Sequence, residues 1–150
     1  MNHTCNKDQS ESSKLVLDLL SQHQQFHQFL DKLALRTDDM SVIEALIDIR
    51  KVNIDCITKY TDLLSKKYNF LGLANDVKTV SVPALREDDM TLWNIHGQLA
   101  RFVPLYSHAI RKNVLTKIHR MFVAHNYESI ISMKEQLLHP VSEEALMERA

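Results

Sequence analysis

Glycine and proline are scarce in this chain, which holds two glycines and three prolines among 150 residues. Folds built from β-strands need many tight turns, and tight turns draw on these two residue types. The hydrophobic fraction is 45%, which is ordinary for a globular domain that buries a real core. We therefore expect an all-α protein with long helices.

Cysteine is also rare, with Cys5 and Cys56 as the two in the chain. They form no CxxC pair and no disulfide framework, which is typical of a reduced, cytoplasmic protein. The N-terminal segment is polar and has no apolar core of a signal peptide. No apolar run approaches the length of a membrane span. We predict a cytoplasmic protein without a membrane partner, with residues 1–10 as a flexible polar tail and 11–150 as a single domain.

A strong charge imbalance and the common catalytic motifs are missing as well. The chain has 18 basic and 19 acidic residues and a net charge of −1, which gives no general attraction to nucleic acid or to an anionic membrane. It has no nucleophile elbow, no glycine-rich phosphate loop and no HExxH sequence. Cys56 lies beside a helical stripe and resembles a packed thiol. We expect no enzymatic activity.

The most regular amphipathic segment is 14–36, KLVLDLLSQHQQFHQFLDKLALR. Its apolar residues recur every three or four positions, which is the period of one helix face. They are Val16, Leu19, Leu20, Phe26, Leu30, Leu33 and Ala34. His23 and His27 lie on the same stripe, each seven residues from an apolar member on either side. Both imidazoles are therefore expected to face the interior.

A second helix is predicted from the capping-box residues Ser41 and Glu44 to about Phe70, with Gly72 as its C-cap. Its expected inward stripe is Ile43, Leu46, Ile47, Ile54, Ile57, Thr61, Leu64 and Tyr68. Residues 73–88 contain Pro83 and lack a helical period. They are interpreted as an extended crossover that could run along a bundle.

A third helix is expected after Asp88 or Asp89, with an inward stripe through the following residues: Leu92, Ile95, His96, Leu99, Phe102 or Val103, Tyr106, Ala109 and Ile110. Pro104 either kinks this helix or opens the next one, and the continuing period favours a kink. The next stripe is Val114 or Leu115, Ile118, Met121, Phe122 and His125. The phase then slips, so Asn126 either caps a new helix or marks a bend.

His139 and Pro140 predict the end of that helix, and Ser142 starts a short acidic one. No repeat of fixed period is visible, which argues against a solenoid. The predicted fold is all-α, a four-helix-type bundle with a long crossover between the second and third helices and a short C-terminal helix.

Four of the eight histidines lie on the predicted inward stripes: His23, His27, His96 and His125. Two histidines four residues apart on a helix can reach one metal, and helical bundles build iron or zinc sites from such residues. The segments LLSQHQQFHQFLDKL, NIHGQLARFVPLY and FVAHNYESI resemble the histidine helices of hemerythrin-like domains. The resemblance implies a helical bundle with an iron site.

The ligand set that this resemblance implies is incomplete. The family takes a histidine and a bridging carboxylate from its second helix, whereas 42–70 contains no histidine. Glu128 follows His125 by three residues, where the family pattern uses four. A histidine on an inward stripe is commonly a hydrogen-bonded boundary residue. The first expectation is therefore no cofactor, and the alternative is a hemerythrin-like iron or zinc domain for sensing or storage.

No Asp or Glu occurs between Met90 and Tyr127, while this stretch supplies five basic residues. They are Arg101, Arg111, Lys112, Lys117 and Arg120. The stretch is either an ordinary solvated face or a docking surface for an acidic protein, and nucleic-acid association is a minor alternative. Histidine phosphotransfer finds little support, because His96-Gly97 lacks the lysine that usually follows the reactive histidine.

These observations predict a small, non-enzymatic regulatory or adaptor domain that binds a protein partner through a helix face, with the five basic residues as the binding surface. A homo-oligomer is compatible with the sequence.

Overall fold

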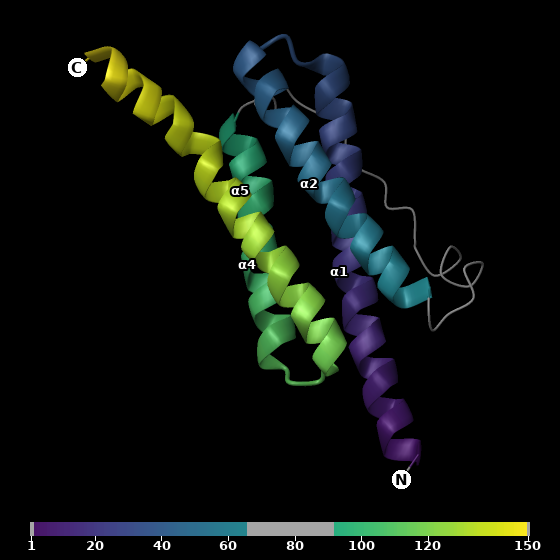
Figure 1. Ribbon diagram of the computed structural model, residues 1–150. Helices are drawn as coiled ribbons and strands as arrows, with labels where there is room; N and C mark the ends of the chain where they lie inside the picture. Colours follow the sequence, from purple (N-terminus) through teal and green to yellow (C-terminus); the bar gives the residue numbers. More distant parts are fainter. Residues whose placement is uncertain (1, 66–91, 150) are drawn as a thin grey trace.

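The computed structural model describes residues 2–65 and 92–149, with the side chains of 11–65 and 92–137. These ranges form the helices α1 (Asn2–Arg36), α2 (Met40–Ser65), α4 (Leu92–Arg111) and α5 (Lys117–Arg149), and they contain no strand. The helices pack side by side, so the prediction of an all-α bundle is confirmed (Figure 1). None of the helices described has an apolar stretch long enough to cross a lipid bilayer.

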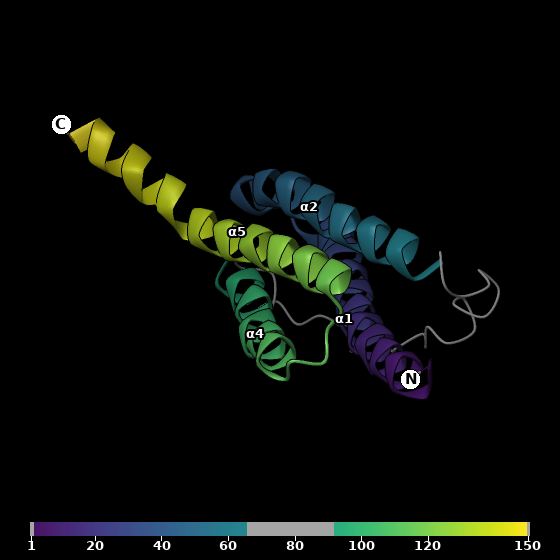
Figure 2. The same cartoon turned by 60° about the horizontal axis from the view of Figure 1, so that its bottom comes forward.

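The bundle is made of two helical hairpins. The main packing partners are α1 with α2, and α4 with α5. Figures 1 and 2 show that α2 and α4 run in the same direction, so the end of α2 and the start of α4 lie at opposite ends of the bundle. The predicted crossover at 73–88, the Gly72 cap and the caps at Asp88 or Asp89 lie outside the described residues.

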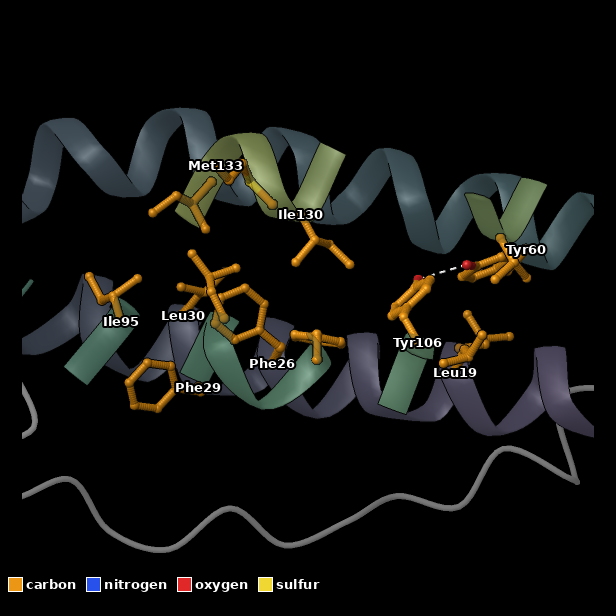
Figure 3. Close-up of a cluster of buried hydrophobic side chains, with 14 of the residues drawn as sticks. Leu19, Phe26, Phe29, Leu30, Tyr60, Ile95, Tyr106, Ile130 and Met133 are labelled. Atoms are coloured by element: carbon orange, nitrogen blue, oxygen red, sulfur yellow. Dashed lines mark hydrogen bonds between the residues drawn. The ribbon is translucent and has the colours of Figure 1, made fainter. Parts of the chain in front are cut away.

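The buried residues of each helix follow alternating steps of three and four, the heptad spacing of coiled-coil seams. In α4 they are Ile95, Leu99, Phe102, Tyr106 and Ala109. In α2 they are Val42, Leu46, Ile49, Asn53, Cys56, Tyr60, Leu63 and Leu64. Figure 3 shows side chains from α1, α2, α4 and α5 meeting in one core. The stripes predicted for α1 and α4 match the buried faces of these helices, apart from His27, His96 and other half-buried members.

The stripe predicted for α2 is right at Leu46 and Leu64, which are buried, but two of its members lie outside. Tyr68 falls outside the described residues. Ile47 and Ile54 are 65% and 45% exposed, while Asn53 and Cys56 are buried. The helix carries two rows of residues that fit a helical period, and the buried one contains the polar Asn53. The prediction placed only apolar residues inside, so it selected the row with Ile47 and Ile54. The N-cap also differs from the predicted one, because Asp39 Oδ1 accepts the Ser41 N–H at 2.9 Å and α2 begins at Met40.

The stripe predicted for the start of α5 is wrong for the same reason. Ile118 and Met121 are 59% and 64% exposed, and His125 is exposed too. Asn126 caps no new helix but is buried within α5. The buried row is continuous: Leu115, His119, Val123, Asn126, Ile130, Met133 and Leu137. The phase therefore does not slip once the polar His119 and Asn126 are counted as inward residues.

Both ends of the chain are more helical than the sequence predicts. The expected polar tail at 1–10 is helical from Asn2, where no glycine or proline interrupts the backbone. Ser12 and Ser13 are buried within α1. Pro140 does not end α5, so the short helix expected from Ser142 is the last part of α5, beyond a change of direction visible in Figure 1. The fixed φ of proline is itself helical, and its cost is one backbone hydrogen bond. The backbone likewise continues through Pro104, so the prediction of one helix there is confirmed.

Candidate functional site

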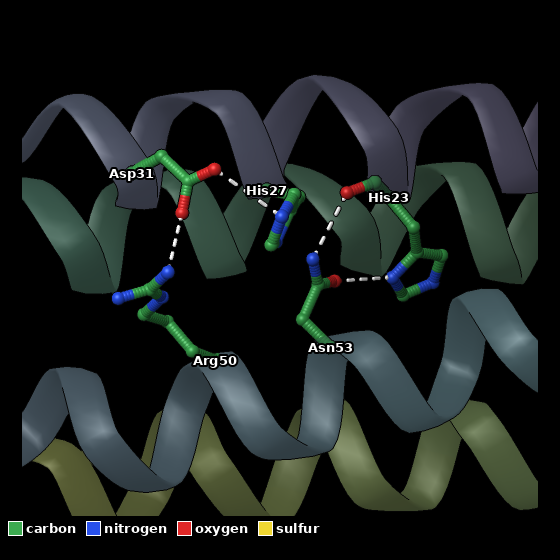
Figure 4. Close-up of polar contacts among 5 residues, drawn as sticks. All are labelled: His23, His27, Asp31, Arg50 and Asn53. Carbon is green, nitrogen blue, oxygen red and sulfur yellow. Dashed lines mark hydrogen bonds and ion pairs between the residues drawn. The ribbon is translucent and has the colours of Figure 1, made fainter.

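His23 lies in the core with both ring nitrogens hydrogen-bonded. Its Nδ1 lies 2.7 Å from Asn53 Oδ1, and its Nε2 lies 2.6 Å from the Tyr106 hydroxyl. Asn53 Nδ2 donates to the His23 backbone carbonyl at 2.9 Å, which identifies Asn53 Oδ1 as an acceptor (Figure 4). His23 therefore carries its proton on Nδ1, and Nε2 accepts from Tyr106.

The hydrogen bonding continues from Tyr106 to Tyr60, whose hydroxyl oxygens are 2.6 Å apart (Figure 3). Because Tyr106 donates to His23, Tyr60 must donate to Tyr106. We call Tyr60, Tyr106, His23 and Asn53 the buried polar chain. It joins α2, α4 and α1, so it ties the two hairpins together.

Burial keeps the side chains of the buried polar chain uncharged. It lowers the pKa of His23 from 6.5 to about 4, and the hydrogen bond to Asn53 offsets part of that change. Burial also raises the pKa of both tyrosines above the ordinary value of 10. It raises the pKa of Cys56 to about 12, with a smaller contribution from the Asp55 carboxylate. Neutral groups held in this way hydrogen-bond and pack well, but they make poor nucleophiles or bases at neutral pH.

Asn126 brings α5 to the same region. Its amide is close enough to the Tyr60 hydroxyl to lower that pKa slightly, yet neither amide atom makes a hydrogen bond of normal geometry. The residue is 1% exposed. A buried amide without partners costs free energy, so Asn126 is a weak point beside the buried polar chain.

His27 does not share the surroundings of His23. Its Nε2 lies 3.3 Å from Asp31 Oδ2, and the other Asp31 oxygen accepts from Arg50 at 2.6 Å (Figure 4). The His27 side chain is 31% exposed. The two histidines therefore serve different contacts, one in the core and one in a surface cluster of charges.

The four histidines of the metal interpretation are not brought together. His96 is half-buried beside Trp93, with ring centroids 6.0 Å apart, and His125 lies on the exposed side of α5. Within the described part of the chain, no three His, Cys, Asp or Glu side chains are placed to hold a metal ion. The predicted inward position of His125 is therefore wrong, and His96 is half-buried. For His125 the cause is the mistaken phase of α5, and His96 lies at the edge of its stripe.

His119 is a buried histidine that the sequence analysis missed. The Ser12 hydroxyl lies 2.6 Å from His119 Nδ1 and accepts the Thr116 N–H at 2.8 Å. The start of α5 is fastened to α1 through this contact. A signal was present, since His119 continues the heptad row that runs from Leu115 to Asn126.

Four of the five predicted basic residues gather at the turn between α4 and α5. Arg111, Lys112, Lys117 and Arg120 are all exposed. Asn113 closes α4 in the left-handed conformation, with φ of 55°, and accepts a hydrogen bond from Arg120 at 2.6 Å. Arg101 is also exposed, but it precedes Arg111 by ten residues, which is about 15 Å along a helix. It is not part of the cluster.

The basic residues differ in what they do for their own helices. Arg111 and Lys112 lie at the end of α4, where positive charge is favourable. Lys117 is the first residue of α5, whose first turn has no acidic residue. Positive charge is unfavourable at that end of a helix. Helix stability therefore does not explain Lys117.

Two large apolar side chains lie among these charges. Ile118 and Met121 are on the exposed side of the first turns of α5. We call the following residues the α5 surface: Arg111, Lys112, Lys117, Ile118, Arg120 and Met121. It combines apolar contact area with positive charge and holds no acidic side chain.

No protein-family model, curated protein or solved structure matches this chain. Function is therefore argued from the residues themselves.

Proposed function

We propose that this protein is a non-enzymatic regulatory or adaptor domain that docks an acidic protein partner on the α5 surface. The observation that carries the proposal is the exposure of Ile118 and Met121, at 59% and 64%, in the same first turns of α5 as the exposed Lys117 and Arg120. Large exposed apolar residues rimmed by charge are typical of protein interfaces. A basic rim speeds the approach of an acidic partner and disfavours basic ones.

The partner that fits this surface is an acidic amphipathic helix. Ile118 and Met121 are three residues apart, so they present one face of α5 to a groove or ridge of similar spacing. The methionine side chain is flexible enough to adapt to different apolar surfaces. Carboxylates flanking the partner's apolar face would meet Lys117 and Arg120.

The rest of the molecule supports a binding role through rigidity. The buried polar chain is neutral and hydrogen-bonded, which suits a scaffold rather than a reactive centre. The Ser12–His119 contact holds the α5 surface on α1. His23 uses both ring nitrogens within the protein, which disfavours the metal-binding alternative.

The test is photo-crosslinking in cells from a photoreactive residue placed at Met121, with the adduct identified by mass spectrometry. The variant Lys117→Glu/Arg120→Glu should reduce the adduct about tenfold, because it reverses the charges that face the partner. The matched control is Lys14→Glu/Arg101→Glu, which reverses an exposed lysine and an exposed arginine outside the α5 surface. Circular dichroism of both variants reports that the helices are retained.

An acidic protein in the adduct, lost in the α5 variant and kept in the control, is the expected result. Equal adduct from all three proteins would contradict the proposal. A crosslink to RNA or DNA would replace the protein partner with nucleic acid.

A further inference from the structure

A second exposed apolar row runs along α2, on the side away from the core. Met40, Ile47 and Ile54 are 65%, 65% and 45% exposed. Their spacing of seven residues equals about two helical turns, so they lie in one line. Ile43 lies between them and is half-buried. The core row of the same helix contains Asn53, whereas this outer row is apolar.

A line of carboxylates lies beside the outer apolar row of α2. Glu44, Asp48, Asp55 and Asp62 are all exposed and follow steps of four and seven residues, so they form a line beside it. Lys59 is paired with Asp55 at 3.0 Å. The exposed Lys51 lies between the apolar row and the acidic row, four residues from Ile47 and from Asp55. We call the following residues the α2 surface: Met40, Glu44, Ile47, Asp48, Lys51, Ile54 and Asp55. Its three carboxylates outnumber its one lysine. It is an acidic amphipathic helix face, the chemistry that the α5 surface requires of a partner.

We propose that the α2 surface of one molecule docks on the α5 surface of a second copy of this chain. The apolar row would meet Ile118 and Met121, and the carboxylates would meet Lys117 and Arg120. The inference rests on the proposed function, because it assigns an occupant to the same α5 surface. Charge decides the pairing: two α2 surfaces would set carboxylates against carboxylates, and two α5 surfaces would set cations against cations.

This pairing regulates the α5 surface. A second copy that occupies it excludes the acidic partner, so the surface available for the partner falls as the concentration of the protein rises. The partner and the second copy compete for Lys117 and Arg120. The effect needs no conformational change, since both surfaces are already exposed.

Sedimentation velocity of the purified full chain tests the contact. The mean mass should rise with protein concentration at low salt, and the rise should shrink at high salt. Glu44→Lys/Asp48→Lys on α2 and Lys117→Glu/Arg120→Glu on α5 should each weaken self-association about tenfold. A mixture of the two variants should associate again, because each supplies the surface that the other has reversed. Circular dichroism confirms that both variants stay helical.

A wild-type chain that stays monomeric at every concentration would overturn the inference. Self-association that survives the α5 variant but not the α2 variant would overturn it as well, because it would mean a contact between two α2 surfaces. The α2 variant keeps its α5 surface, so its crosslink from Met121 tests the partner separately. A retained adduct without self-association removes this inference and leaves the proposed function. Self-association that is rescued in the mixture, without any partner adduct, supports this inference and contradicts the proposed function.

Discussion

At the scale of residues, His23 is a titratable side chain that this fold holds as a neutral ring. Its pKa is near 6.5 in an unfolded chain and about 4 in the fold. Above pH 6.5 the ring is neutral in both states and adds no pH dependence. As the pH falls from 6.5 to 4, the unfolded chain binds a proton that the folded chain does not, so stability is lost.

We expect the free energy of unfolding to fall by about 3 kcal/mol from this group between pH 7 and pH 4. Urea denaturation at a series of pH values measures it. The His23→Gln variant should be less stable than wild type at pH 7. Its free energy of unfolding should fall by about 3 kcal/mol less than that of wild type between pH 7 and pH 4. His125→Gln, at an exposed position, should keep the wild-type slope. Parallel curves for wild type and His23→Gln would contradict the assignment.

The direction of the hydrogen bonds predicts unequal roles for the two buried tyrosines. Tyr106→Phe leaves His23 Nε2 without its donor and the Tyr60 hydroxyl without its acceptor, which should cost roughly 2–4 kcal/mol. Tyr60→Phe removes the end of the chain and leaves the bond to His23 intact, so it should cost about 1 kcal/mol. Chemical denaturation of both variants measures the difference. Equal losses would contradict the central place of Tyr106 between His23 and Tyr60.

Substitution by leucine should change the free energy of unfolding in opposite directions at two buried asparagines. Asn126→Leu removes an amide without partners and should raise the free energy of unfolding by about 1 kcal/mol. Asn53→Leu leaves the His23 Nδ1–H unpaired and removes the bond from Asn53 Nδ2 to the His23 carbonyl, so it should lower the free energy of unfolding by about 2 kcal/mol. Thermal unfolding compares them directly. Destabilisation by Asn126→Leu would show that the amide makes bonds in solution.

At the scale of helices, Lys117 has opposite effects on stability and on binding: its charge destabilises the start of α5 but belongs to the proposed docking surface. Lys117→Glu places a carboxylate at the start of α5 and should raise the free energy of unfolding by about 0.3–1 kcal/mol. The same change should weaken partner crosslinking and self-association. Lys14→Glu, within α1, is the control for an exposed lysine away from a helix end and outside both proposed surfaces. A Lys117→Glu variant that is more stable and still binds fully would remove this residue from the docking surface.

The faces of α1 and α4 could be predicted because their inward rows are almost wholly apolar. Those of α2 and α5 could not, because each helix sets polar residues inside and a row or pair of large apolar residues outside. Asn53 is hydrogen-bonded to His23, thirty positions away in the sequence, and Ser12 to His119, 107 positions away. Contacts between such distant residues leave no local signal. Periodicity alone therefore cannot show that these polar residues are the inner ones.

The candidate site was predictable in its charge but not in its apolar part. Exposure of the five basic residues follows from their type, and the absence of acid near them is visible in the sequence. Ile118 and Met121 were assigned to the core by the same phase error that placed His125 there. The structure therefore changes the predicted surface from a charged face to a mixed one. It also separates Arg101 from the others.

At the scale of the whole molecule, stability and association should respond differently to salt. The core is apolar and the buried polar chain is neutral, so sodium chloride should shift the melting temperature little. Contacts of the α5 surface should weaken markedly over the same range, because opposite exposed charges attract through solvent. Thermal unfolding and sedimentation velocity in one salt series compare the two. Association that strengthens with salt would mean an apolar contact without charge pairing.

The parallel course of α2 and α4 has a consequence for how the chain folds. Each hairpin closes over a short turn, so its contacts are local and can form quickly. Docking the hairpins brings together residues separated by a much longer stretch of chain than either turn, and this costs more entropy. The Tyr60–Tyr106 bond joins the two hairpins and should form in the last step. Tyr106→Phe should therefore speed unfolding and leave the folding rate almost unchanged.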